Sequence, residues 1–198
     1  RGLGDVYKRQ RPYRPKRRTR ATIAKEKGLE PLAEILRAQA TTRTIEEEAT
    51  AFVDAEKGVE SVQDAIDGAK DILAEVYADD ADYRTKLRAM TKESGSLVAK
   101  AKDEEADSVY EMYYDFSEPI KKLVGHRILA INRGEAEKFL TVKIEAPRQE
   151  ILLWLVKQII GNMKHDSASY LYEAITDSYD RLIAPCLLYT SDAADDMQ

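Results

Sequence analysis

The sequence predicts a mainly α-helical fold with one small β-hairpin at about residues 126–146. Only 9 glycines and 6 prolines occur among 198 residues, so few positions interrupt a helix. Apolar residues recur at three- and four-residue steps over most of the chain, which is typical of amphipathic helices. The period changes to strict alternation at Leu140, Val142 and Ile144, which is typical of a half-buried strand.

The sequence pattern predicts three short helices in the N-terminal part of the chain. They cover residues 19–28, 29–40 and 44–53. Thr19 and Thr22 are both candidate N-caps of the first helix, because a threonine hydroxyl can accept a hydrogen bond from a free N–H of the first turn. Gly28 suits the position after its C-terminus, where the backbone is commonly left-handed.

The strongest helical pattern covers residues 59–78, with Ser61 as a candidate N-cap. Gly68 lies inside this pattern and costs about 1 kcal/mol relative to alanine, so we expect another element to pack closely there. The pattern continues over residues 80–93 and is broken by the Ser-Gly-Ser of residues 94–96.

The middle of the chain mixes helical and strand periods. Residues 96–102 predict a short strand, and two further helices are predicted at 103–116 and 116–123. The hairpin comes next: its strands are "RILAIN" and "FLTVKIE", and Gly134 supplies the turn between them. An isolated hairpin is only marginally stable, so we expect it to pack on the helices.

The last part of the chain predicts an αα-hairpin. Its helices cover residues 147–162 and 165–185, and Gly161-Asn162 marks the break between them.

The charge of the chain is unevenly distributed. The net charge is −5, yet residues 8–27 hold ten basic residues and one acid, whereas residues 28–198 hold 20 basic and 34 acidic residues. Such a cluster can neutralise several phosphates, and a tyrosine within it can stack on a base. The candidate nucleic-acid-binding residues, which we call the basic block, are Arg11, Tyr13, Arg14, Lys16, Arg17, Arg18, Arg20, Lys25 and Lys27. Docking of the block onto acidic helices of the same chain is the alternative, and the sequence leaves both open.

The candidate catalytic patterns are weak. His165-Asp166-Ser167 contains the residue types of a hydrolase triad, but adjacent residues do not converge as a triad requires, so we expect them to open the last helix. Two histidines and the single Cys186 give no zinc-binding spacing. Consecutive acids fan around a helix axis instead of converging. We therefore expect that the protein is not an enzyme and that it binds no metal and no cofactor.

Four stretches carry a resemblance to a known family. They are "YRPKRRTRATIAKEKGLEPLAE" (13–34), "EKGVESVQDAIDGAKDILAE" (56–75), "YDFSEPIKKLVGHRILAINRGEAEKFLTVKIE" (114–145) and "SYLYEAITDSYDRLIAP" (169–185). In order and spacing they resemble the N-terminal helical region of the Tex family of bacterial transcription accessory proteins. The resemblance covers about residues 11–185, which we predict to be one Tex-like helical region.

The resemblance implies a function. Tex-family proteins are large cytoplasmic nucleic-acid-binding factors, in which this region precedes an RNase H-like domain, helix-hairpin-helix elements and an OB-fold RNA-binding domain. A non-catalytic fragment is implied, with helices that scaffold the later domains and a basic block that contacts RNA or DNA without sequence preference. The alternative is a protein-interaction module that binds the transcription machinery. Neither interpretation implies a membrane or a small-molecule substrate.

Both ends of the sequence look foreign to the fold. The chain begins with arginine, and residues 1–10 and 186–198 resemble translated sequencing-adapter sequence. We expect that neither segment belongs to the fold and that Cys186 is not a native residue; genuine flexible tails are the alternative.

Overall fold

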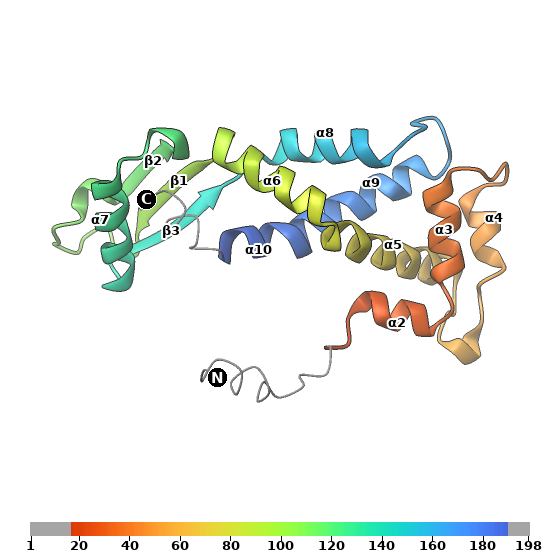
Figure 1. Ribbon diagram of the computed structural model, residues 1–198. Helices are drawn as coiled ribbons and strands as arrows, with labels where there is room; N and C mark the ends of the chain where they lie inside the picture. Colours follow the sequence, from red (N-terminus) through yellow and green to blue (C-terminus); the bar gives the residue numbers. More distant parts are fainter. Residues whose placement is uncertain (1–16, 190–198) are drawn as a thin grey trace, which may run out of the picture.

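A computed structural model describes residues 17–189 and shows an elongated molecule with two unequal lobes (Figure 1). The larger lobe is helical and the smaller one is built on a sheet. The helical lobe contains α2 (Arg20–Glu26), α3 (Glu30–Ala38), α4 (Ile45–Thr50), the 3₁₀ turn η1 (Ala55–Lys57), α5 (Val62–Asp79), α8 (Arg148–Ile159), α9 (Ala168–Asp177), the π-helix η4 (Ser178–Ile183) and α10 (Ala184–Tyr189). Helix α6 (Ala81–Ser94) connects this lobe to the sheet. The mainly helical fold class is therefore confirmed.

Helix α5 lies at the centre of the helical lobe. It packs against α2, α3, α4, α9 and η4. Its stripe of buried residues comprises Ala65, Ile66, Ala69, Ile72, Leu73, Ala74 and Tyr77. The hydroxyl of Ser178, itself fully buried, donates a 2.6 Å hydrogen bond to the carbonyl of Ala74, so a polar contact also fixes η4 on this helix.

The close approach expected at Gly68 is confirmed. A side chain at this position would overlap Leu29 and would press on Ala24, which belong to the α2–α3 segment. Glycine therefore lets the segment lie directly on the backbone of α5.

The predicted helix starts in this lobe are also confirmed. The side chain of Thr19 accepts from the N–H of Thr22 (3.2 Å), and that of Ser61 accepts from the N–H of Asp64 (3.1 Å). Gly28 has a φ of 76°, the left-handed conformation expected after α2.

The smaller lobe contains a three-stranded antiparallel sheet of order β2-β1-β3. Its elements are β1 (Ser96–Ala101), η2 (Glu111–Tyr113), β2 (Asp115–Pro119), η3 (Ile120–Lys122), α7 (Gly125–Ala136) and β3 (Leu140–Glu145). Ala99 pairs with Phe116 on one side and with Val142 on the other. The strand predicted at residues 96–102 is therefore confirmed, and it is the central strand.

The hairpin predicted at residues 126–146 is wrong in its first half. "RILAIN" lies in α7, and β3 pairs with β1 instead. Gly134 lies inside α7, where Leu140 packs on it, and the left-handed turn residue is Lys138. A short apolar run does not separate strand from helix by its period, and the burial of Ile131 in the core beneath the sheet selects the helix.

The two helices predicted at residues 103–116 and 116–123 are also wrong. Only the short 3₁₀ turns η2 and η3 form there, and β2 lies between them. Tyr113 and Phe116 stack edge-to-face with ring centroids 5.3 Å apart, so the aromatic side chains of this segment are used to cover the sheet.

The C-terminal αα-hairpin is confirmed, because α8 and α9 pack together around the break at residues 160–167. The boundary that we place at residue 186 falls within α10, where Leu187 packs against the helical core. Residues 1–10, four of the nine residues of the basic block and residues 190–198 lie outside the described residues. No helix in the described range 17–189 has the length and apolar content needed to cross a bilayer.

We predict that Gly68→Ala lowers the free energy of unfolding by about 1–3 kcal/mol, because the added methyl group overlaps Leu29 in a well-packed contact. Urea unfolding followed by circular dichroism would measure it. Gly125→Ala is the matched control: a methyl group at Gly125 meets no other atom within 4 Å, so the change should stay within about 0.5 kcal/mol. Equal effects of both substitutions would contradict close packing at Gly68.

We also predict that joint deletion of residues 1–10 and 186–198 changes the melting temperature by no more than about 2 °C, because we expect neither segment to belong to the fold. A longer C-terminal deletion that also removes Ile183 is the control, because this side chain is buried and its loss should cost several degrees. A comparable loss from the shorter deletion would show that the end of α10 belongs to the native fold.

Candidate nucleic-acid interface

The structure describes part of the basic block. Arg11, Tyr13, Arg14 and Lys16 lie outside the described residues. The described members are Arg17, Arg18, Arg20, Lys25 and Lys27, which lie on or beside α2. All of these except Lys27 are exposed, and Lys27 is half-buried next to Gly58.

Helix α2 holds this part of the block against α5. Ala21 and Ala24 are buried in the contact, so the apolar side of α2 faces the core. Thr19, which caps α2, also donates a 2.8 Å hydrogen bond from its hydroxyl to Glu75 of α5. Packing and this hydrogen bond consequently fix the backbone that carries the cations of α2 on the helical lobe.

Three of the described cations differ in whether they form an ion pair. Arg18 forms an ion pair with Glu26 at the other end of α2. Arg17 and Lys25 are exposed and form no ion pair with any described residue. Arg17 and Lys25 can therefore meet an external anion without first breaking an ion pair with a described residue.

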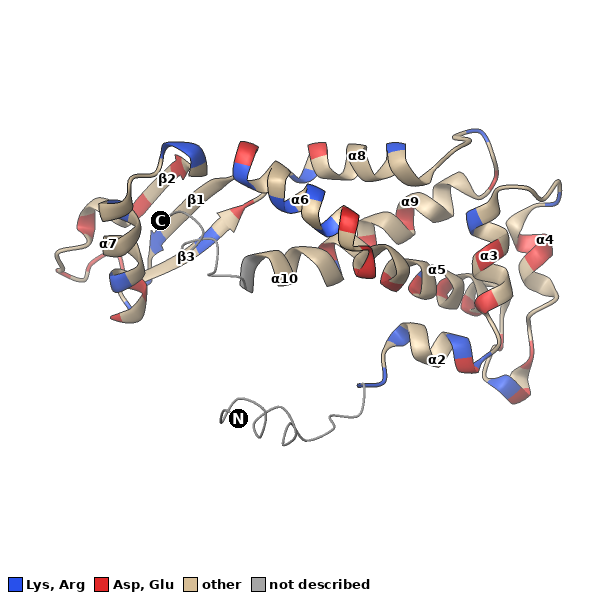
Figure 2. Ribbon diagram, viewed as in Figure 1, with Lys and Arg blue, Asp and Glu red and all other residues tan. Residues whose placement is uncertain are grey.

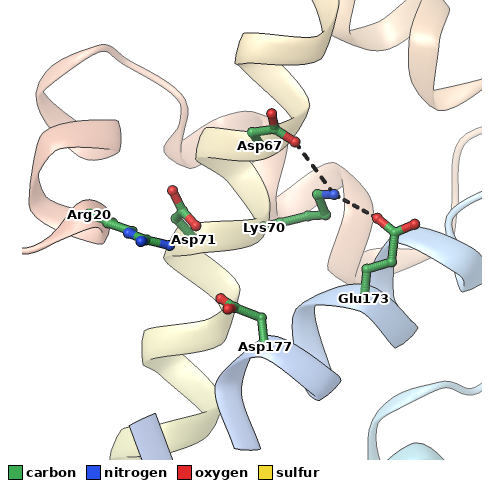
Figure 3. A pocket seen from close by; sticks show the side chains of 6 residues that line it. All are labelled: Arg20, Asp67, Lys70, Asp71, Glu173 and Asp177. Atoms are coloured by element: carbon green, nitrogen blue, oxygen red, sulfur yellow. Dashed lines mark hydrogen bonds and ion pairs between the residues drawn. The ribbon is translucent and has the colours of Figure 1, made fainter. Parts of the chain in front are cut away.

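Arg20 takes a different position, at the edge of a charged cavity of about 350 Å³ between α2, α5 and α9 (Figure 3). The cavity is lined by Arg20, Asp67, Lys70, Asp71, Glu173 and Asp177. Arg20 reaches toward Asp71, while Lys70 bridges Asp67 (3.5 Å) and Glu173 (2.6 Å). Two cations thus line the cavity together with four carboxylates, and Arg20 is the described member of the block that lies there.

The pKa values of Asp71 and Lys70, which line the cavity, reflect burial and neighbouring charges. Burial is the largest influence on Asp71 and raises the pKa of its carboxyl, which Arg181 and Arg20 counteract. Burial lowers the pKa of Lys70, but the hydrogen bond and charge of Glu173, together with Asp67, raise the pKa by more. Its ammonium therefore remains paired, and the cavity works as an internal electrostatic contact between helices.

The residues of the apparent triad have structural roles. His165 contacts the carbonyl of Thr41 through Nε2 (2.8 Å), and its Nδ1 accepts from the N–H of Ser167 (3.1 Å). Asp166 accepts a 2.7 Å hydrogen bond from the N–H of Ile45, the first residue of α4. These contacts fix the start of α9 to the start of α4. Within residues 17–189, no group of three His, Cys, Asp or Glu side chains is arranged to hold a metal ion.

The sequence interpretation missed a second group of cations, on α6. Arg84, Arg88 and Lys92 follow one another at four-residue steps and are exposed, as is Lys86 (Figure 2). The signal was present in the sequence, because residues four apart share one face of a helix.

Comparison with known proteins places the chain among relatives of similar sequence. A family model described as Tex central region-like matches residues 40–174. The uncharacterized protein YdcI of Bacillus subtilis is 43% identical over 188 residues, which is 93% of this chain and 26% of that protein. Protein tex of Bordetella pertussis is 38% identical over 144 residues, or 72% of this chain and 18% of that protein.

A third relative has a name that states a role. The transcriptional accessory protein Tex of Neisseria gonorrhoeae is 34% identical over 146 residues, which is 72% of this chain and 18% of that protein. The chain thus spans between 18% and 26% of the length of the three relatives.

We predict a measurable coupling between Arg20 and Asp71. In a double-mutant cycle of Arg20→Gln and Asp71→Asn, the interaction energy should be favourable but below about 1 kcal/mol, because the arginine is exposed. The free energies of unfolding in urea supply the measurement. Arg17→Gln replaces Arg20→Gln in a control cycle, which should give no coupling. Equal couplings in both cycles would contradict a specific contact of Arg20.

Proposed function

The chain belongs to the Tex family, and from this premise we propose that it is a non-catalytic, nucleic-acid-binding part of a cytoplasmic transcription accessory protein. The role in the name of the gonococcal relative supports the second half of this proposal. The helical lobe acts as the scaffold, and the basic block contacts the phosphates of RNA or DNA without reading their sequence.

The observation that carries the proposal is the density of cations in the block relative to the acids available to them. Only Arg18 and Arg20, among the described members, lie beside carboxylates of the chain. Exposed ion pairs contribute about 0–1 kcal/mol each, so folding stability gives little reason to gather so many cations in one segment. Contact with a polyanion gives a stronger reason, because each neutralised phosphate releases counterions.

The position of α2 supports a division of roles within the block. Arg20 docks on the acidic cavity, and the buried alanines of α2 hold the helix on α5. Arg17 and Lys25 face solvent, and Arg17 directly follows the part of the block that lies outside the described residues. In our proposal the docked arginine positions the segment and the other cations meet the phosphates.

A second candidate function is contact with proteins of the transcription machinery. Exposed apolar side chains in the sheet lobe favour it: Val109 is 83% exposed, Met112 73% and Leu129 69%. Side chains of this kind commonly mark interaction sites when they gather on one surface. Because the chain spans between 18% and 26% of the length of these relatives, other domains of the same protein are also candidates to cover them.

We predict that binding of a single-stranded RNA depends strongly on salt. If about four phosphates are engaged, the slope of log affinity against log salt should be roughly −3. Fluorescence anisotropy with several probe sequences would measure it. Glutamine is placed in the test variant at Lys16, Arg17, Arg18 and Arg20, which should flatten the slope and weaken all sequences alike.

A control variant removes the same amount of charge elsewhere. It carries glutamine at the exposed positions Lys138, Lys143, Lys157 and Lys164 and should keep most of the slope. Unchanged RNA affinity of the test variant, together with a lower melting temperature, would mean that the block serves only to dock on the chain. Gels of the same samples should show intact RNA with and without magnesium, and metal-dependent cleavage that one carboxylate substitution abolishes would contradict the non-catalytic role.

A further inference from the structure

The exposed face of α6 carries a stripe of cations, which we call the α6 stripe: Arg84, Arg88 and Lys92. These residues lie four apart, so each step advances about 6 Å along the helix on nearly the same side. Lys86 adds a fourth cation on another part of the exposed surface. Between Arg84 and Lys92 the sequence contains no acid.

Arg84 and Arg88 of the stripe differ from several other surface arginines of the described chain. Arg37, Arg43, Arg127, Arg148 and Arg181 each form an ion pair with a carboxylate. Arg84, Lys86 and Arg88 form none with a described residue. Arg133 of α7 and Lys157 of α8 also form none, but each is the single such cation of its helix, whereas α6 carries three.

Helix stability does not explain this arrangement. Like charges four residues apart repel each other, so the spacing of Arg84 and Arg88 weakens α6. Arg84 also lies near the N-terminal end of the helix, where the helix dipole disfavours a positive charge. Glu93, an acid at the C-terminal end, is already paired with Lys121 of η3.

The helix is available on the surface. Leu87 is the only fully buried side chain of α6, and Tyr83 packs edge-to-face on Trp154 of α8 with ring centroids 5.7 Å apart. The apolar side of α6 is therefore occupied, while Arg84, Arg88 and Lys92 are exposed. Lys122 of η3, which packs at the C-terminal end of α6, is exposed as well.

We propose that the α6 stripe binds the phosphate backbone of double-stranded nucleic acid, at a site separate from the basic block. A convex helix with cations at regular steps suits a run of phosphates, and phosphate contacts alone give binding without sequence preference. No exposed aromatic ring accompanies the cations on α6, since its one aromatic, Tyr83, is packed on Trp154. Sites for single strands combine cations with stacking rings, so the absence of such a ring from this helix favours a duplex.

The test compares two charge-matched variants of the full chain. Arg84→Gln with Arg88→Gln removes two stripe cations, and glutamine preserves helix propensity. Arg37→Gln with Arg43→Gln removes two exposed arginines that pair with acids near α3 and α4. The probe is a fluorescent blunt-ended duplex of mixed sequence, and anisotropy is measured over a range of salt concentrations.

The stripe variant should bind the duplex more weakly, with a salt slope flatter by about 1.8, or about 0.9 for each lost phosphate contact. The control variant should keep the wild-type slope. Equal slopes for the stripe variant and the wild type, equal losses in both variants, or no duplex binding by the wild type at low salt would each overturn the proposal.

Two further measurements separate this site from others. Single-strand binding that depends on the basic block, in a protein that ignores the duplex, would leave the proposed function standing and refute the stripe. A labelled polyglutamate tests the other class of partner: if its binding requires Arg84 and Arg88 while duplex binding does not, the stripe contacts an acidic protein segment and the proposal is wrong.

Discussion

Burial of α5 on several sides is the constraint on which the helical lobe depends. The α2–α3 segment can reach its backbone because Gly68 leaves room for Leu29, and the C-terminal segment reaches another side, where Ser178 bonds to Ala74. One helix therefore joins the two ends of the described chain. Since a few kcal/mol is a large part of a domain's stability, loss of close packing at a single point on α5 affects every element around it.

The electrostatics of the chain follow from this packing. Bringing α2 and α9 onto α5 places Arg20 and Lys70 among four carboxylates, so the charges of three helices are partly compensated where the helices meet. Several cations elsewhere form ion pairs, such as Arg37 with Glu34 and Arg148 with Asp180. Arg17 and Lys25 of the basic block, and Arg84 and Arg88 of the α6 stripe, are exposed and form no ion pair with a described residue. Their distribution, and not the net charge, is the basis of the two binding sites that we propose.

Sequence alone predicted the parts of the fold that are governed by local chemistry. The caps at Thr19 and Ser61, the close approach at Gly68 and the long period of α5 all follow from residues near one another in the chain. It could not be predicted that "RILAIN" forms a helix and not a strand, because burial of Ile131 depends on a sheet assembled from distant residues. For the same reason, the sequence could not show which cations of the basic block lie near acids: tertiary packing brings Arg20 into the cavity that Asp71 also lines.

The properties of α6 have one common origin, which is its low burial. A helix that connects two lobes and buries only Leu87 fully gains little from packing, so its remaining positions are not constrained by the core. Water and salt screen repulsion between exposed charges, and therefore Arg84 and Arg88 can lie four residues apart at small cost. On a helix as deeply packed as α5, the same spacing would bury uncompensated charge, which is far more costly. Exposure thus permits the cationic face, and in our proposal an external anion gives its regular spacing a use.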